Sequence, residues 1–76
     1  MIDNRIKELR TDNDLTQQTV AKAIGITQRK YSYIETGTQP ATDEILISLA
    51  KFYRTSIDYI LKLTDERKPY PFLKNK

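Results

Sequence analysis

The stretch from residue 15 to residue 37, LTQQTVAKAIGITQRKYSYIETG, constrains the fold more than any other part of this 76-residue chain. Apolar side chains recur at helical spacing on both sides of Gly25. Glycine takes the left-handed conformation that ends a helix without steric cost. Thr16 and Thr27 each stand one residue before a helical segment, where an N-cap is expected. The stretch predicts two short helices, 17–24 and 28–36, joined by a tight turn.

The apolar residues of this stretch can fill the angle between the two helices. Alanine at position 21 is small enough to let one helix backbone approach another. The residues expected to face the core are Val20, Ala21, Ile24, Ile26, Tyr31 and Ile34, and Gly37 is expected to end the second helix.

One further helix is predicted before this stretch. Ile2, Ile6 and Leu9 form a single helical stripe, and Asp3 or Asn4 can cap or charge its first turn favourably.

Two further helices are predicted after the central stretch. Thr42 can cap a fourth helix, whose predicted buried residues are Ile45, Leu46, Leu49, Phe52 and Tyr53. Thr55, with Asp58 three residues later, resembles a capping box that opens a fifth helix anchored by Ile57, Ile60 and Leu61. The fold class is therefore all-α, a compact five-helix bundle over residues 1–63. Residues 64–76 contain two prolines and many charges, which predicts a short extended or disordered tail, a candidate oligomerisation element.

The composition excludes several classes of function. The chain has no cysteine and no histidine, so disulfides, thiolate sites and the commonest metal ligand and general base are all missing. No nucleophile–base pair can be proposed, and we expect no enzyme activity, no metal, no cofactor and no small-molecule ligand. No apolar run approaches the roughly 20 residues of a membrane span, so a cytoplasmic protein without membrane contact is expected.

The net charge of +3 is unevenly distributed along the chain. Residues 15–39 carry Lys22, Arg29 and Lys30 against Glu35 alone, and residues 66–76 also carry an excess of positive charge. The second helix of the central stretch presents amides, hydroxyls and cations on its outer side. Such a surface is suited to base edges and phosphates, because glutamine pairs with adenine and arginine with guanine.

The central stretch resembles the helix-turn-helix of the Cro- and phage-repressor-type (XRE-like) bacterial regulators. The similarity extends over roughly residues 2–63, because IKELR before the motif and LAKFYRTSIDYIL after it are similar to the flanking helices of that family. The resemblance implies the phage-repressor type of DNA-binding domain, with a helix-turn-helix unit over about residues 16–36. The helix over residues 28–36 would enter the major groove of double-stranded DNA.

The resemblance also implies roles for individual residues. The base-reading residues would be Gln28, Arg29, Ser32 and Tyr33. The phosphate-contacting residues would be Thr16, Gln17, Thr27, Lys30, Thr38 and Gln39. Arg10 and Glu35 match positions that commonly form a salt bridge inside the domain.

Two functional hypotheses follow. The first is a sequence-specific transcriptional regulator, a repressor that binds a palindromic operator as a homodimer, because one helix-turn-helix reads too few bases. The predicted dimer contacts are Ile57, Ile60 and Leu61, with Tyr70, Phe72 and Leu73 of the tail as further apolar candidates. The second is an antitoxin or adaptor, a protein-interaction module that uses the helical domain and the basic and aromatic tail.

Overall fold

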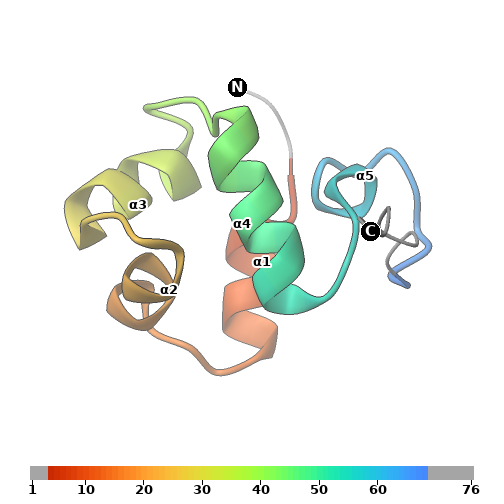
Figure 1. Cartoon of the computed structure of the whole chain (residues 1–76), viewed down its shortest axis with the longest axis horizontal. Coiled ribbons are helices and arrows are strands. Elements are labelled where there is room, and N and C mark those ends of the chain that lie inside the picture. Colours follow the sequence, from red (N-terminus) through yellow and green to blue (C-terminus); the bar gives the residue numbers. More distant parts are fainter. Residues whose placement is uncertain (1–3, 69–76) are drawn as a thin grey trace, which may run out of the picture.

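The computed structural model describes residues 4–68, which form five α-helices and no strand. The helices are α1 (Ile6–Asp12), α2 (Gln17–Ile24), α3 (Gln28–Thr36), α4 (Asp43–Tyr53) and α5 (Ile57–Ile60). Helices α1 and α4 occupy the centre of the molecule, with α2 and α3 on one side and α5 on the other (Figure 1). Helix α2 packs against α3 and α4, and α4 also packs against α5. The predicted all-α fold class is confirmed, and no helix within residues 4–68 combines the length and apolarity needed to cross a bilayer.

Threonine caps begin three of the helices at the predicted positions. The hydroxyl oxygens of Thr16, Thr27 and Thr42 accept hydrogen bonds from the backbone N–H three residues later, at 3.1, 3.1 and 3.4 Å. Each such cap stabilises a helix by about 1 kcal/mol. The caps therefore fix where α2, α3 and α4 begin, and with them the orientation of their first turns.

Glycines end α2 and α3. Gly25 has φ +79° and Gly37 has φ +84°, both in the left-handed region. A Cβ added at Gly25 would meet no atom within 4 Å, so the backbone conformation and not the available space requires glycine there. Gly25 thereby sets the turn between the two helices of the motif.

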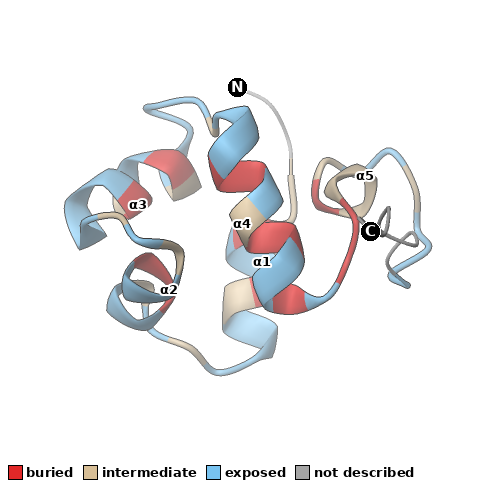
Figure 2. Ribbon diagram, in the orientation of Figure 1, coloured by how far each residue is buried: buried red, intermediate tan, exposed pale blue. Residues whose placement is uncertain are grey.

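One hydrophobic core joins all five helices (Figure 2). Its buried members face inward on every helix, while the outer faces are exposed. Ile24 and Ile26 are partly buried against it. The core consists of Ile6, Leu9, Val20, Ala21, Tyr31, Ile34, Ile45, Leu46, Leu49, Ala50, Tyr53 and Ile60.

The buried face of α4 differs from its prediction at one position. Phe52 was expected in the core but is 38% exposed, and Ala50 is buried instead. The ring of Phe52 lies edge-on to Tyr53, with the centroids 4.9 Å apart. Tyr53, the next residue, occupies the buried position at the end of α4. Phe52 therefore lies at the edge of the exposed face of the helix.

The predicted capping box of α5 is wrong by one residue. Ser56 caps the helix, because its hydroxyl accepts the Tyr59 backbone N–H at 3.0 Å. The hydroxyl of Thr55 instead donates to the carbonyl of Arg67 at 2.7 Å and is almost completely buried. Thr55 therefore fastens the segment after α5 to the end of α4.

The described part of the predicted tail, residues 64–68, is non-helical and follows the surface of the domain. Besides the Thr55 contact, Asp65 accepts a hydrogen bond from Arg5 Nη2 at 2.9 Å. Arg5 also donates to the carbonyl of Tyr59 and lies over its ring, 4.3 Å from the centroid. Arg5 thus links the start of α1 to α5 and to the segment after it. Tyr70, Phe72 and Leu73, predicted as dimer candidates, lie outside the described residues, as does Ile2.

Candidate nucleic-acid interface

The first turns of α2 and α3 expose unpaired backbone N–H groups. The cap hydroxyls satisfy the N–H groups of Thr19 and Lys30, and the earlier donors of each helix, at residues 17, 18, 28 and 29, have no partner within the helix. Such donors, aligned with the helix dipole, favour an anion such as a phosphate. The N-terminal ends of both helices can therefore contribute to a phosphate-binding surface.

The acidic residues in the first turn of each helix distinguish α2 and α3 from the other three helices. Neither α2 nor α3 has an acidic residue in its first turn. In contrast, Glu8 lies in the first turn of α1, Asp43 and Glu44 in that of α4, and Asp58 in that of α5. A carboxylate would repel a phosphate, so α2 and α3 are the helices whose N-terminal ends suit a polyanion.

The four predicted base readers lie together on this surface. A shallow hollow is lined by Gln17 of α2 and by Gln28, Arg29, Ser32 and Tyr33 of α3. The side chains of Gln28 and Arg29 are exposed, and Tyr33 is 38% exposed. The hollow therefore presents amides, a guanidinium, a hydroxyl and a phenol within reach of one ligand.

Lys30, a predicted phosphate contact, does not line the hollow of the predicted base-reading residues. It borders a second hollow, formed by the Gly25 turn and the first half of α4, together with Glu44 and Ile47. Its side chain is exposed and lies beside the α2–α3 turn.

The backbone N–H groups of the loop after α3 are used in hydrogen bonds within the protein. The backbone N–H groups of Thr38 and Gln39 both donate to the carbonyl of Tyr33, at 2.8 and 3.1 Å. The hydroxyl of Thr38 shares a hydrogen bond of 3.0 Å with that of Thr36. Any phosphate contact by Thr38 and Gln39 must therefore use their side chains.

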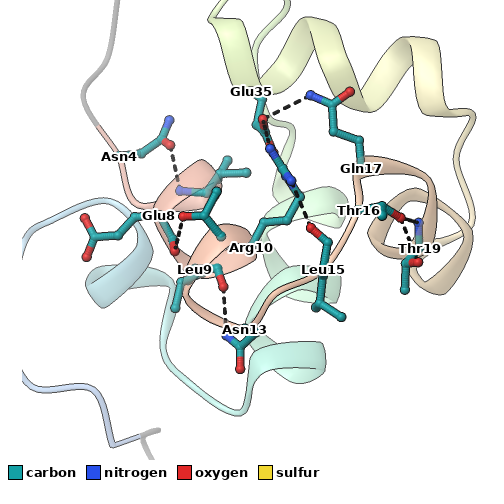
Figure 3. A network of polar contacts seen from close by, with 12 residues as sticks. Asn4, Glu8, Leu9, Arg10, Asn13, Leu15, Thr16, Gln17, Thr19 and Glu35 are labelled. Carbon is teal, nitrogen blue, oxygen red and sulfur yellow. Dashed lines mark hydrogen bonds and ion pairs between the residues drawn. The ribbon is translucent and has the colours of Figure 1, made fainter.

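A polar network connects this surface to the interior (Figure 3). The guanidinium of Arg10 donates through Nε and Nη2 to the carboxylate of Glu35, and through Nη1 to the carbonyl of Leu15 at 2.9 Å. The amide Nε2 of Gln17 donates to Glu35 Oε1 at 3.1 Å. The ion pair between Arg10 and Glu35 was expected from the sequence, and the bond from Gln17 was not. The network joins α1, α2 and α3 at one carboxylate.

Glu35 remains ionised within this network. Burial acts to raise its pKa, but hydrogen bonds from Arg10 and Gln17 outweigh burial and hold the pKa below its ordinary value. The neighbouring Tyr31 is fully buried, and burial together with the Glu35 charge raises the pKa of its hydroxyl. The Tyr31 hydroxyl is close enough for the charge of Glu35 to affect its pKa. It nevertheless makes no hydrogen bond of normal geometry within the described part of the chain.

The predicted dimer contacts differ in how accessible they are. Ile60 has no exposed surface and belongs to the core, so its burial does not fit a place at a dimer surface. Ile57 and Leu61 are half-buried. Leu61 borders a largely apolar hollow with Ile34, Pro40 and Ala41, beside the loop after α3.

Within residues 4–68, no group of three or more histidine, cysteine or carboxylate side chains is placed to hold a metal ion.

Comparison with known proteins agrees with this geometry. A family model described as helix-turn-helix matches residues 6–60. The chain is 37% identical over 71 residues to the uncharacterized HTH-type transcriptional regulator YobD of Bacillus subtilis, an alignment that covers 93% of this chain and 63% of that protein. It is 40% identical over 57 residues to the cryptic phage CTXphi transcriptional repressor RstR of Vibrio cholerae, covering 75% of this chain and 51% of that protein.

The chain thus spans less than two thirds of the length of either relative. No solved structure gives a significant match. The resemblance to phage-repressor-type regulators drawn from the sequence is confirmed by the family match and the named relatives.

Proposed function

Because the chain belongs to the helix-turn-helix family of phage-repressor type, we propose that it is a sequence-specific DNA-binding transcriptional regulator, and specifically a repressor. The observation that carries the proposal is the hollow on α2 and α3, where Gln17, Gln28, Arg29, Ser32 and Tyr33 meet. It adjoins the two helix ends that have free N–H groups and no acidic residue in the first turn. No other helix end of the described chain combines these properties.

In the proposed complex, α3 lies in the major groove of double-stranded DNA. Gln28 and Arg29 contact base edges, and Ser32 and Tyr33 do so one turn later. The N-terminus of α2, with Thr16 and Gln17, contacts the phosphates of one strand. Thr27, Lys30, Thr38 and Gln39 supply further phosphate contacts through their side chains, and these contacts fix the position of α3 without reading sequence.

The proposed regulator acts as a homodimer on a palindromic operator. Two domains related by a two-fold axis would place two α3 helices about one helical turn of DNA apart. The apolar hollow beside Leu61, Pro40 and Ala41 supports a dimer surface there, because it lies at the end of α3 opposite to the base-reading residues Gln28 and Arg29. Ile57 remains a candidate contact on the neighbouring α5. Binding to an operator that overlaps a promoter would repress transcription because the bound protein occupies the promoter. The proposed place of action is the cytoplasm.

The test is a selection of bound duplexes from a random double-stranded DNA library, followed by footprinting on the recovered sequence. A palindromic consensus with half-sites about 10 base pairs apart, centre to centre, supports the dimeric operator. A single unpaired half-site would contradict the dimer. Failure to enrich any sequence over several rounds would contradict sequence-specific binding itself.

A further inference from the structure

The side chain of Gln17 is held from inside the protein. Its Nε2 donates to Glu35 Oε1 at 3.1 Å, and the Glu35 side chain is only 3% exposed. Gln17 is itself half-buried, and it also lines the hollow that contains Gln28 and Arg29. One side chain thus contacts both the interior carboxylate and the proposed DNA surface.

The chemistry of the two groups determines which end of the amide faces inward. An ionised carboxylate only accepts hydrogen bonds, whereas a primary amide has two donors on Nε2 and an acceptor at Oε1. Glu35 can therefore hold only the nitrogen end of Gln17. Because Nε2 carries two N–H groups, one donor remains after the bond to Glu35. A phosphate, which is also only an acceptor, requires that remaining donor.

Glu35 has little freedom to release Gln17. Arg10 binds both oxygens of its carboxylate, and Arg10 is anchored in turn to the carbonyl of Leu15. Leu15 lies just before the Thr16 cap of α2. The residues that hold Glu35 therefore also hold the backbone from which Gln17 extends (Figure 3).

We propose that Glu35 is a positioning residue for DNA binding, which fixes the Gln17 amide so that its second N–H is available to a backbone phosphate. This inference rests on the proposed function. Glu35 does not touch DNA, and it contributes affinity only through Gln17. Preorganisation of this kind avoids the cost of ordering the side chain when the complex forms.

A double-mutant cycle on the selected operator tests the proposal, with binding titrations of wild type, Gln17→Ala, Glu35→Gln and the double variant. The Glu35→Gln amide can donate as well as accept, so it no longer dictates which end of Gln17 faces inward. Gln17→Ala should weaken binding about tenfold, the effect of one hydrogen bond to a charged group. Glu35→Gln should weaken binding about fivefold when Gln17 is present and less than about twofold in the Gln17→Ala background.

Gln18 provides the matched control, because it is exposed on the same first turn of α2, whereas the hydrogen bond to Glu35 from that turn comes from Gln17. In the Gln18→Ala background the loss caused by Glu35→Gln should stay at about fivefold. A purely structural role of Glu35 would give the same loss in all three backgrounds, and that result would overturn the proposal. Circular dichroism at the titration temperature verifies that each variant is folded.

A second measurement on the wild-type protein does not depend on the variants. In the free protein, the side-chain NH₂ of Gln17 should show a high order parameter by nitrogen-15 relaxation, while that of Gln18 should show extensive averaging. Equal averaging of the two amides would overturn the positioning of Gln17 by Glu35 even if DNA binding is strong. A wild-type protein that binds no duplex would overturn the proposed function and the positioning role together, whereas binding without coupling would overturn only the latter.

Discussion

Arg10 and Glu35 form a two-point ion pair that joins α1 to α3 across 25 positions of the sequence. Nε of Arg10 donates to Oε2, and Nη2 donates to Oε1 at 3.1 Å. The Arg10 side chain is 15% exposed and that of Glu35 is 3% exposed, so removal of either partner leaves a charge with little access to water. The pair is therefore more sensitive to the loss of one partner than an ion pair on the surface.

Replacement of Arg10 by methionine should lower the free energy of unfolding by about 3 kcal/mol. The substitution keeps the aliphatic part of the side chain but leaves the Glu35 carboxylate without its main donor. Urea denaturation followed by circular dichroism measures the change. Asp65→Asn is the control, because Asp65 also contacts an arginine, Arg5 at 2.9 Å, but is fully exposed. Its loss should not measurably change stability, and equal effects of the two substitutions would contradict the argument from burial.

The low pKa of Glu35 predicts a loss of stability in acid. The folded-state pKa lies below the ordinary value of 4.5, so the charged form contributes stability above that pH and the contribution is lost as the pH falls through the folded pKa. Wild type should therefore be more stable than Glu35→Gln near neutral pH, and the difference should shrink in acid. Urea titrations over an acid pH series measure it. A difference that does not vary with pH would contradict a role for the charge.

The raised pKa of Tyr53 predicts that the fold also loses stability in alkali. Burial, and then the charge of Glu35, raise the pKa of its hydroxyl from 10.0 to about 12. The folded state thus favours the neutral phenol. The contribution of this preference to the free energy of unfolding is fully present below pH 10 and is lost as the pH rises through about 12. Tyr53→Phe should reduce this alkaline loss, although the raised pKa of Tyr31 leaves part of it in place.

Unfolding free energies between pH 10 and pH 12, together with phenolate absorbance, test the alkaline prediction. Near neutral pH, Tyr53→Phe should leave stability unchanged or higher. The Tyr53 hydroxyl is buried with no hydrogen-bond partner among residues 4–68, and an unsatisfied buried hydroxyl does not stabilise the fold. Parallel pH profiles for wild type and Tyr53→Phe would show that the Tyr53 hydroxyl does not titrate with unfolding.

Local sequence patterns were sufficient to predict most of the fold. The threonine caps and the glycine turns act within a few residues, so both bounds of α2 and α3 and the start of α4 follow from the residues themselves. The error at Thr55 has a different origin. Thr55 and Ser56 are both competent caps, and the choice between them depends on a bond from Thr55 to Arg67, twelve residues away. Phe52 and Tyr53 were both predicted to be buried, but only Tyr53 lies in the core, because the spacing of apolar residues along a helix does not reveal where its buried face ends.

The sequence predicted which residues lie together on the outer face of α3, but it did not predict the hydrogen bonds around them. Gln28, Arg29, Ser32 and Tyr33 share one face of a helix, so helical spacing brings them together. The bond from Gln17 to Glu35 joins residues 18 positions apart on two helices, and its existence depends on the angle between those helices. The use of the Thr38 and Gln39 N–H groups by the Tyr33 carbonyl likewise depends on how the chain leaves α3.

Gln28 and Lys30, on the same helix, should affect DNA binding in different ways. Gln28 lies in the hollow with the other proposed base-reading residues, whereas Lys30 lies in the separate hollow beside the Gly25 turn. Gln28→Ala should reduce discrimination between bases at one operator position by about 1–3 kcal/mol, because a bidentate base contact is lost. Lys30→Ala should weaken binding to all sequences alike and reduce the salt slope of the binding constant by about one, because a phosphate contact is lost.

Titrations at several salt concentrations, on the selected operator and on its single-base variants, separate the two effects. A change in base preference on Lys30→Ala would place Lys30 among the base readers, against its position in the structure. A uniform loss on Gln28→Ala would make Gln28 a phosphate contact, and the proposed docking of the α3 N-terminus into the major groove would then be wrong. The two substitutions together therefore distinguish base reading from backbone contact along one helix, independently of how the dimer forms.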